Sequence, residues 1–250
     1  MESVKKGISS TISTVIITAT LLVILLVASF FATNLLEIQV QNSEFEQAKT
    51  AILLLDKTII DVALRQGAAS SVQFSQRSGG IGIYEGGKIN ITVYSDSGIL
   101  WNNTINTTYV IKYRGGNLVA AAEVNFTNPG GLIITSASKP LGYVRVEVEN
   151  GVWIILDYNR IRITVNQNLG TMDIYFIRLA PGFIVGSGPA IIRVQNNSTN
   201  VELRQLESPS PVRVSVMIDD QNEVYPSLSE PGILVSAFRF IEVTIEVSIM

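Results

Sequence analysis

Residues 15–36 of the chain read VIITATLLVILLVASFFATNLL, and this stretch decides the first element of the fold. The run without a charged residue is longer and extends from Gly7 to Leu36, and 15 of the 18 residues from Val15 to Ala32 are apolar. A helix from Val15 to Leu36 is about 33 Å long, which is enough to cross a hydrocarbon core of about 30 Å. The sequence therefore predicts a membrane-spanning helix near the N-terminus.

The charges on either side of this run predict its orientation. Lys5 and Lys6 precede it, whereas the next charges are glutamates that begin at Glu37. The positive-inside rule places the N-terminus in the cytoplasm and everything after residue 37 outside. A cleaved secretory signal is the alternative, but its apolar core is shorter than this run, and the nearest cleavage candidate, Val27-Ala28-Ser29, is a poor match. We expect the segment to be retained.

The helical pattern continues beyond the apolar run, because no turn signal appears before Gly67. A helix from Ile8 to Gln66 is about 88 Å long, much more than an anchor needs. Its second half must bury an apolar stripe against either the outer domain of the same chain or the same helix of neighbouring copies, and the periodicity leaves both open. The stripe has a heptad-like spacing, broken by Gln41, and consists of Ile38, Phe45, Ala48, Ile52, Leu55, Ile59 and Val62.

The remaining sequence predicts a β-rich domain. Residues 67–87 are rich in glycine and serine and are typical of a loop or linker. Residues 88–250 contain short runs of β-branched and aromatic residues, including a hairpin signal at Asn150-Gly151 and strict alternation from Ile241 to Ile249. The expected class is α+β: a long N-terminal helix followed by an antiparallel all-β sandwich of one or two subdomains.

Composition excludes several functions. The chain has 250 residues with 18 basic and 21 acidic side chains, so its net charge of −3 does not favour nucleic-acid binding. It has no cysteine or histidine, which excludes disulfides, thiolate nucleophiles and Ser-His-Asp triads. We expect a non-enzymatic protein with neither cofactor nor metal. The segment Asp219–Glu223 contains several side chains with the oxygen ligands that calcium binds, but an acidic loop between strands is more often solvated than a calcium site.

Asn-x-Ser/Thr sequons predict glycosylation of the outer domain. Each lies beyond the membrane-spanning run, on the side that the charge asymmetry places outside. We expect at least some of them to carry a glycan. Their asparagines are Asn90, Asn102, Asn106, Asn125, Asn196 and Asn197.

The N-terminal sequence resembles a known family. The short basic leader Met1–Gly7, followed at once by Ile8-Ser9-Ser10 and the long apolar run, resembles the class III signal of type IV pilin-like proteins, especially archaeal ones. The resemblance covers about the first 65 residues. Bacterial pilins usually carry a glutamate at the fifth mature position, where this chain has Ile12, and many archaeal members lack that acid.

The resemblance implies a processing step and an assembly. A prepilin peptidase would cut between Gly7 and Ile8, after Lys5 and Lys6, leaving the apolar helix on the mature protein. The helices would then pack side by side as the core of a filament, with the β-domains outside. Inferred partners are copies of the same chain, the peptidase with the pilus assembly machinery, and the cytoplasmic membrane before assembly.

The sequence thus predicts a filament subunit at the cell surface. The expected helix self-assembly residues are Val15, Leu22, Leu26, Phe30, Phe31, Ile38, Phe45, Ile52, Leu55 and Ile59. The alternative is a single-span cell-surface glycoprotein whose β-domain binds a ligand or another envelope component. That alternative requires the stripe from Ile38 to Val62 to be buried inside one chain.

Overall fold

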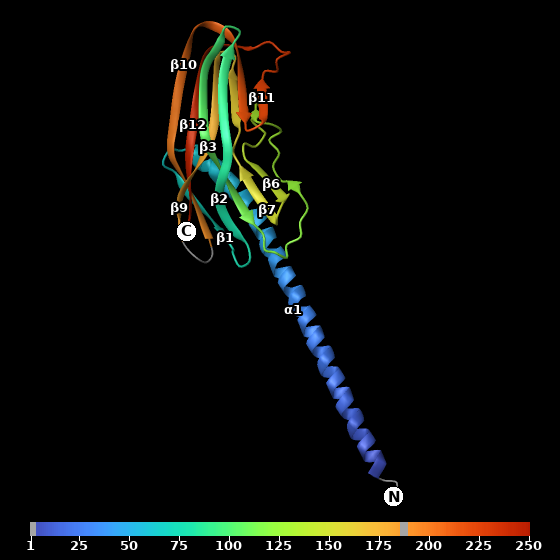
Figure 1. Cartoon of the computed structure of the whole chain (residues 1–250). Coiled ribbons are helices and arrows are strands. Elements are labelled where there is room, and N and C mark those ends of the chain that lie inside the picture. Colours follow the sequence, from blue (N-terminus) through green and yellow to red (C-terminus); the bar gives the residue numbers. More distant parts are fainter. Residues whose placement is uncertain (1–3, 186–189) are drawn as a thin grey trace.

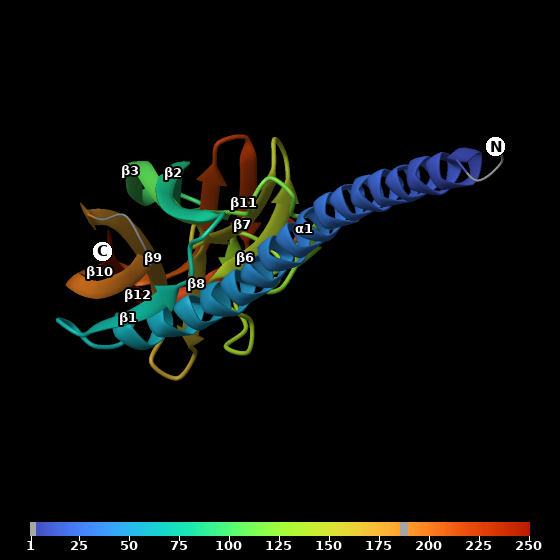
Figure 2. The same ribbon diagram turned by 90° about the horizontal axis from the view of Figure 1, so that it is seen from below.

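The computed structural model describes the backbone of residues 4–185 and 190–250, and the side chains of residue 12 onward within those ranges. It contains a long helix, α1 (Val4–Ala63), and a β-rich domain that packs on the second half of that helix (Figures 1 and 2). The first half of α1 projects away from the domain. The expected α+β class with a long N-terminal apolar helix is confirmed.

Helix α1 is continuous because the sequence contains nothing that breaks it. From Ile8 to Gln66 there is neither glycine nor proline. Gly67 follows the helix with φ +77°, a left-handed conformation that residues with a Cβ rarely adopt. The predicted end of the helix at residue 66 lies three residues beyond the observed end at Ala63.

Strands make up most of the remaining chain. The segment 67–87 is not a linker: it contains β1 and the start of β2. Val72 and Phe74 of β1 are buried, so this short alternating pattern adds a strand despite the glycine and serine around it. The strands are β1 (Ala69–Phe74), β2 (Gly80–Ser95), β3 (Gly98–Arg114), β4 (Val124–Asn125), β5 (Ile133–Ile134), β6 (Tyr143–Val148), β7 (Val152–Asp157), β8 (Ile161–Asn166), β9 (Thr171–Ile184), β10 (Ala190–Ile218), β11 (Gln221–Tyr225) and β12 (Ile233–Ile249).

Within the described ranges, hydrogen bonds join these strands into one mixed sheet. Its order is β4-β6-β7-β3-β2-β10-β12-β9-β8-β5, and β1 and β11 also pair with β10. Pairs β9–β12 and β5–β8 are parallel, so the expected purely antiparallel arrangement is wrong. The first follows from topology: β12 inserts between the successive strands β9 and β10, so it is antiparallel to one and parallel to the other. A division into two stacked sheets is not confirmed.

Two hydrophobic cores lie on opposite faces of the long strands. In β9, Met172 and Ile174 belong to a core made by strands alone, whereas Ile177 and Leu179 belong to the core that α1 covers. Because side chains alternate along a strand, this change from even to odd positions moves the packing from one face to the other. Strand β12 makes the same change between Phe240 and Val243.

Two local predictions are confirmed. Asn150 and Gly151 both have positive φ, at 52° and 125°, and connect β6 to β7 as a tight antiparallel hairpin. The alternating C-terminal sequence forms the end of β12, with Val243, Ile245 and Val247 buried under the helix.

Candidate functional site

The most distinctive surface is the projecting half of α1, residues 12–39, in which every side chain is exposed. This helix is long and apolar enough to cross a membrane, and its most apolar 18-residue window has a mean hydropathy of 2.8 with none of it buried. Soluble proteins rarely leave so much contiguous apolar surface in water. The predicted residues Val15, Leu22, Leu26, Phe30, Phe31 and Ile38 all lie on this surface and are 36% to 65% exposed.

Three threonine hydroxyls within the projecting half donate to carbonyls of the helix itself. The hydroxyl of Thr18 donates to the carbonyl of Thr14 (2.9 Å), and that of Thr33 donates to the carbonyl of Ser29 (2.9 Å). Thr20 donates to the carbonyl of Ile16 in the same way (2.8 Å). These three hydroxyls therefore need no water, which lowers the polar cost of moving the projecting half, called the rod below, into lipid or a bundle of helices.

Four residues predicted for self-assembly lie elsewhere. Phe45, Ile52, Leu55 and Ile59 are at most 2% exposed and belong to the core between α1 and the sheet. Their assignment to contacts between copies is wrong, because the β-domain of the same chain already covers the stripe. The intramolecular alternative is the one observed from Phe45 to Val62.

The neck, where α1 leaves the domain, is held by polar contacts from Gln41 and Glu44. The Glu44 carboxylate accepts bonds from the backbone N–H groups of Arg77 (2.8 Å) and Gly79 (3.2 Å) and from the Ser78 hydroxyl (2.6 Å). It also accepts from the Tyr113 hydroxyl (3.1 Å), while Gln41 accepts from the Leu118 N–H (2.9 Å). Burial raises the pKa of Glu44, but the hydrogen bonds from Ser78, Arg77 and Gly79 outweigh it and hold the pKa below 4.5.

A second polar pair fastens the helix deeper in the domain. The buried Tyr158 hydroxyl donates to the Asp56 carboxylate at 2.5 Å. Burial raises the pKa of Asp56, although the Tyr158 hydrogen bond and the nearby cations Lys57 and Arg160 oppose it. Burial and the Asp56 charge together raise the pKa of Tyr158 well above its usual value. The helix is thus fixed to the sheet by two buried carboxylates about three turns apart.

Asn196 closes the C-terminal end of α1 and is not a glycosylation site. It is 1% exposed, and its Nδ2 donates to the carbonyls of Val62 (3.4 Å) and Ala63 (3.3 Å). The last carbonyls of a helix have no i+4 N–H to accept from, and although the Val62 carbonyl also accepts from the Arg65 N–H (3.2 Å), the Asn196 amide supplies a further donor to both and serves as a C-cap. The nitrogen that would carry the glycan is occupied and buried, and the prediction for this sequon is wrong.

We predict that Asn196→Ala lowers the free energy of unfolding by about 1–3 kcal/mol, because it removes the side-chain donor from the Ala63 carbonyl and leaves the Val62 carbonyl with the Arg65 N–H alone. Chemical denaturation of the purified protein measures this loss. Asn197→Ala is the matched control, since its neighbouring side chain is exposed and the change is expected to be nearly neutral. Equal effects of the two variants would contradict the capping role.

The other sequon asparagines are accessible. Asn102, Asn106, Asn125 and Asn197 are exposed and Asn90 is partly exposed. Two sequons face each other across β2 and β3: Thr104 donates to Asn90 Oδ1 (3.1 Å) and Thr92 donates to Asn102 Oδ1 (3.2 Å). These bonds use the amide oxygen and leave Nδ2, the site of modification, uncommitted. Glycosylation at these five positions stays a prediction.

The predicted processing residues Lys5, Lys6, Gly7 and Ile8 lie in the helical backbone of α1, but outside the residues whose side chains are described. Cleavage between Gly7 and Ile8 therefore stays a prediction from the sequence.

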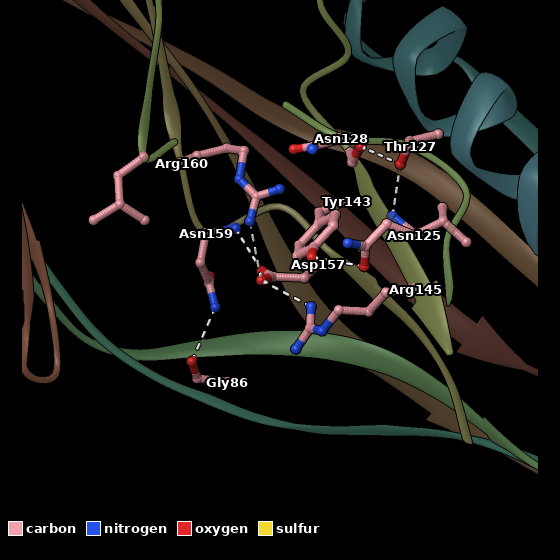
Figure 3. A network of polar contacts seen from close by, with 12 residues as sticks. Gly86, Asn125, Thr127, Asn128, Tyr143, Arg145, Asp157, Asn159 and Arg160 are labelled. Carbon is pink, nitrogen blue, oxygen red and sulfur yellow. Dashed lines mark hydrogen bonds and ion pairs between the residues drawn. The ribbon is translucent and has the colours of Figure 1, made fainter. Parts of the chain in front are cut away.

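A charged cluster that sequence reasoning missed lies between β6, β7 and the loop after β7 (Figure 3). The Asp157 carboxylate lies between Arg145 (3.6 Å) and Arg160 (3.2 Å), and both guanidinium groups stack on the Tyr143 ring. In the described part of the chain, Nε and Nη1 of the buried Arg160 find no acceptor. The sequence does contain a signal for this cluster, because the polar stretch Asp157-Tyr158-Asn159-Arg160 separates the apolar run Val152–Leu156 from the alternating run that begins at Ile161.

This cluster lines an open cleft whose other wall is the β10–β11 turn, from Ile218 to Gln221. Glu223 of β11, just after this turn, stabilises the fold: its carboxylate accepts from the backbone N–H of Ile133 (3.3 Å) and of Leu132. Among the residues with described side chains, no group of three or more His, Cys, Asp or Glu side chains is arranged to hold a metal ion. No family model, curated protein or solved structure matches this chain.

Proposed function

We propose that this protein is a structural, non-enzymatic subunit of a type IV pilus-like filament of the archaeal kind. Before assembly, the subunit is inserted in the cytoplasmic membrane with its N-terminus in the cytoplasm. It then assembles at the cell surface through the projecting half of α1, and its β-domain, glycosylated at accessible sequons, faces outward for surface adhesion. The partners are copies of the same chain, a prepilin peptidase and the pilus assembly machinery.

The observation that carries this proposal is the fully exposed apolar rod of residues 12–39. The uncharged part of this rod, from Ile12 to Leu36, is about 38 Å long, which exceeds the hydrocarbon thickness of about 30 Å that an anchor requires. In water it would expose apolar side chains on every side. Packing against the same rod of other copies keeps these side chains away from water once the subunit leaves the lipid.

A second candidate function has its own observation. Because Phe45, Ile52, Leu55 and Ile59 are buried within one chain, the amphipathic half of α1 needs no second copy to cover its stripe. A single-span anchor carrying a ligand-binding or envelope-binding β-domain satisfies this arrangement equally well. The two functions differ in processing at Gly7 and in contacts between the exposed rods.

The test is Gly7→Leu in native cells. We expect wild-type protein to begin at Ile8 and to form filaments, whereas the variant keeps residues 1–7, stays in the membrane and forms none. Mass spectrometry of the intact protein and electron microscopy of the cell surface measure the two outcomes. Lys6→Arg, which preserves the basic leader, is the matched control. A wild-type protein that retains Met1–Gly7 and remains monomeric would favour the single-span anchor instead.

A further inference from the structure

The chain contains a second uncharged stretch, far from the N-terminal helix. From Leu179 to Ile192, between Arg178 and Arg193, there are 14 residues without a charge. Large apolar side chains are exposed where β9 ends and β10 begins, and Met250, whose carbonyl accepts from the Ile191 N–H, is exposed beside them. This surface, called the basal patch below, consists of Phe183 (75% exposed), Ile184 (67%), Val185 (64%), Ile191 (40%) and Met250 (47%).

The basal patch lies at the end of the domain from which α1 projects. A groove of about 540 Å³ at the neck is lined by Leu36 and Glu44 of the helix and by Gln73 of β1. Gln73 is the direct strand partner of Ile191. The patch is therefore one strand away from the neck, and Figure 1 shows the C-terminus toward the same end of the domain.

Backbone groups in the patch are paired within the protein. The Val185 N–H donates to the carbonyl of Ile249 (2.8 Å), and the Ile191 N–H donates to that of Met250 (2.8 Å). The Phe183 N–H donates to the Ser248 hydroxyl (3.2 Å). Apolar side chains with satisfied backbone can enter a membrane interface at little polar cost.

The position of the rod in a bilayer decides what faces the patch. Leu36 is the last residue of the uncharged run, so the outer edge of the hydrocarbon core lies near it when the run spans the membrane. Leu36 also lines the groove at the neck, beside the strand that pairs with Ile191. The surface facing the patch in the anchored subunit is accordingly the outer leaflet.

We infer that the basal patch is a second membrane-contact element, which rests on the outer leaflet of the lipid bilayer while the subunit is anchored by α1. This inference rests on the proposed membrane-inserted state. Phe183 is the leading contact, since it is the most exposed side chain of the patch and Phe is among the apolar residues that interfacial elements bury at the headgroup boundary. The nearest charged residues along β10 and β12 are Arg193 and Glu246, which lie farther from the patch than Ile191 and Val247. The surface that would meet the membrane is therefore apolar. A rod and a patch together fix the rotation of the domain above the membrane, which a single helix cannot do.

The absence of native cysteine allows a clean test with the full-length protein. Phe183→Cys, Leu26→Cys and Leu228→Cys each receive one environment-sensitive fluorophore and are reconstituted in vesicles that contain nitroxide-bearing lipid. Leu228 is the matched control, because it is also 75% exposed but lies in the connection between β11 and β12. We expect lipid quenching and a shift to shorter wavelength at positions 26 and 183, and iodide quenching from water at position 228.

The remaining outcomes separate the two proposals. Quenching by lipid at position 26 but by iodide at position 183 would leave the anchored helix in place and overturn the patch. Iodide quenching at both positions would overturn the membrane-inserted state itself. Shielding of position 183 that appears only when copies assemble would make the patch a contact between subunits and would also overturn the bilayer contact. A thermal unfolding midpoint of unlabelled Phe183→Cys equal to that of the wild-type protein establishes that the fold is retained.

Discussion

Glu44→Ala is expected to loosen the neck and to lower the free energy of unfolding of the β-domain by about 3 kcal/mol. The reason is that one carboxylate accepts bonds from the Arg77 N–H, from the Ser78 hydroxyl and from Tyr113, and all of these donors stay near the helix without an acceptor once it is gone. Chemical denaturation measures the loss. Hydrogen exchange of the 75–79 segment reports whether the neck opens locally.

The matched control for this prediction is Glu46→Ala on the next exposed face of the helix. Glu46 forms an exposed ion pair with Lys49 at 2.5 Å, and such pairs contribute less than about 1 kcal/mol. A comparable loss for the two variants would mean that helix charge, and not the bonds to the β1–β2 connection, accounts for the effect.

The pH dependence of stability has a definite sign at this position. The folded pKa of Glu44 lies below 4.5, so its contribution is fully present above that value and is lost as the pH falls through the folded pKa. Asp56 acts in the opposite sense: its pKa is raised above 3.8 in the folded protein, so its contribution declines as the pH rises through the folded pKa. Glu44→Gln is expected to flatten the acid limb of stability against pH below about 4.5.

Leu55→Ala is expected to lower the free energy of unfolding by about 2–5 kcal/mol. Leu55 is fully buried between α1 and the sheet, so truncation leaves a cavity in the core that attaches the helix. Equilibrium denaturation followed by far-ultraviolet circular dichroism measures the change.

Leu54→Ala is the control for this substitution, since the neighbouring residue is 53% exposed and its truncation is expected to cost less than about 0.5 kcal/mol. The two variants remove the same atoms one residue apart on the same helix. If Leu54→Ala destabilised the monomer as strongly as Leu55→Ala, the docking face of α1 would be assigned wrongly.

The helix was predictable because its signals are local. The apolar run, the heptad-like spacing from Phe45 to Val62 and the first turn signal at Gly67 are all properties of neighbouring residues. The same holds for the hairpin at Asn150-Gly151 and the alternation at the end of β12. What covers the stripe was not predictable, because periodicity identifies a face that must be buried but not its partner.

The sheet order depends on contacts that local patterns do not encode. No feature of β12 indicates that it inserts between β9 and β10, which makes one of its pairings parallel. Asn196 shows the same limit at a single residue: its sequon is identical in kind to that of Asn197, yet one side chain caps a helix more than 130 positions earlier in the chain and the other is exposed. The segment 67–87 predicts a linker because its glycines and serines outweigh the short alternation of Val72 and Phe74, which in the structure forms β1.

The uninterrupted course of α1 also has a mechanical consequence. The rod and the segment that packs on the sheet are one helix, and from residue 12 onward it contains neither glycine nor proline. No flexible hinge therefore separates the β-domain from the rod. A force along the axis of the rod therefore acts in shear on every contact between α1 and the β-domain at the same time, and does not separate them one after another. These contacts are the Glu44 hydrogen bonds, the apolar stripe and the Asp56–Tyr158 pair. Tension applied to the β-domain is thereby transmitted to the N-terminal end of α1 with little compliance in between.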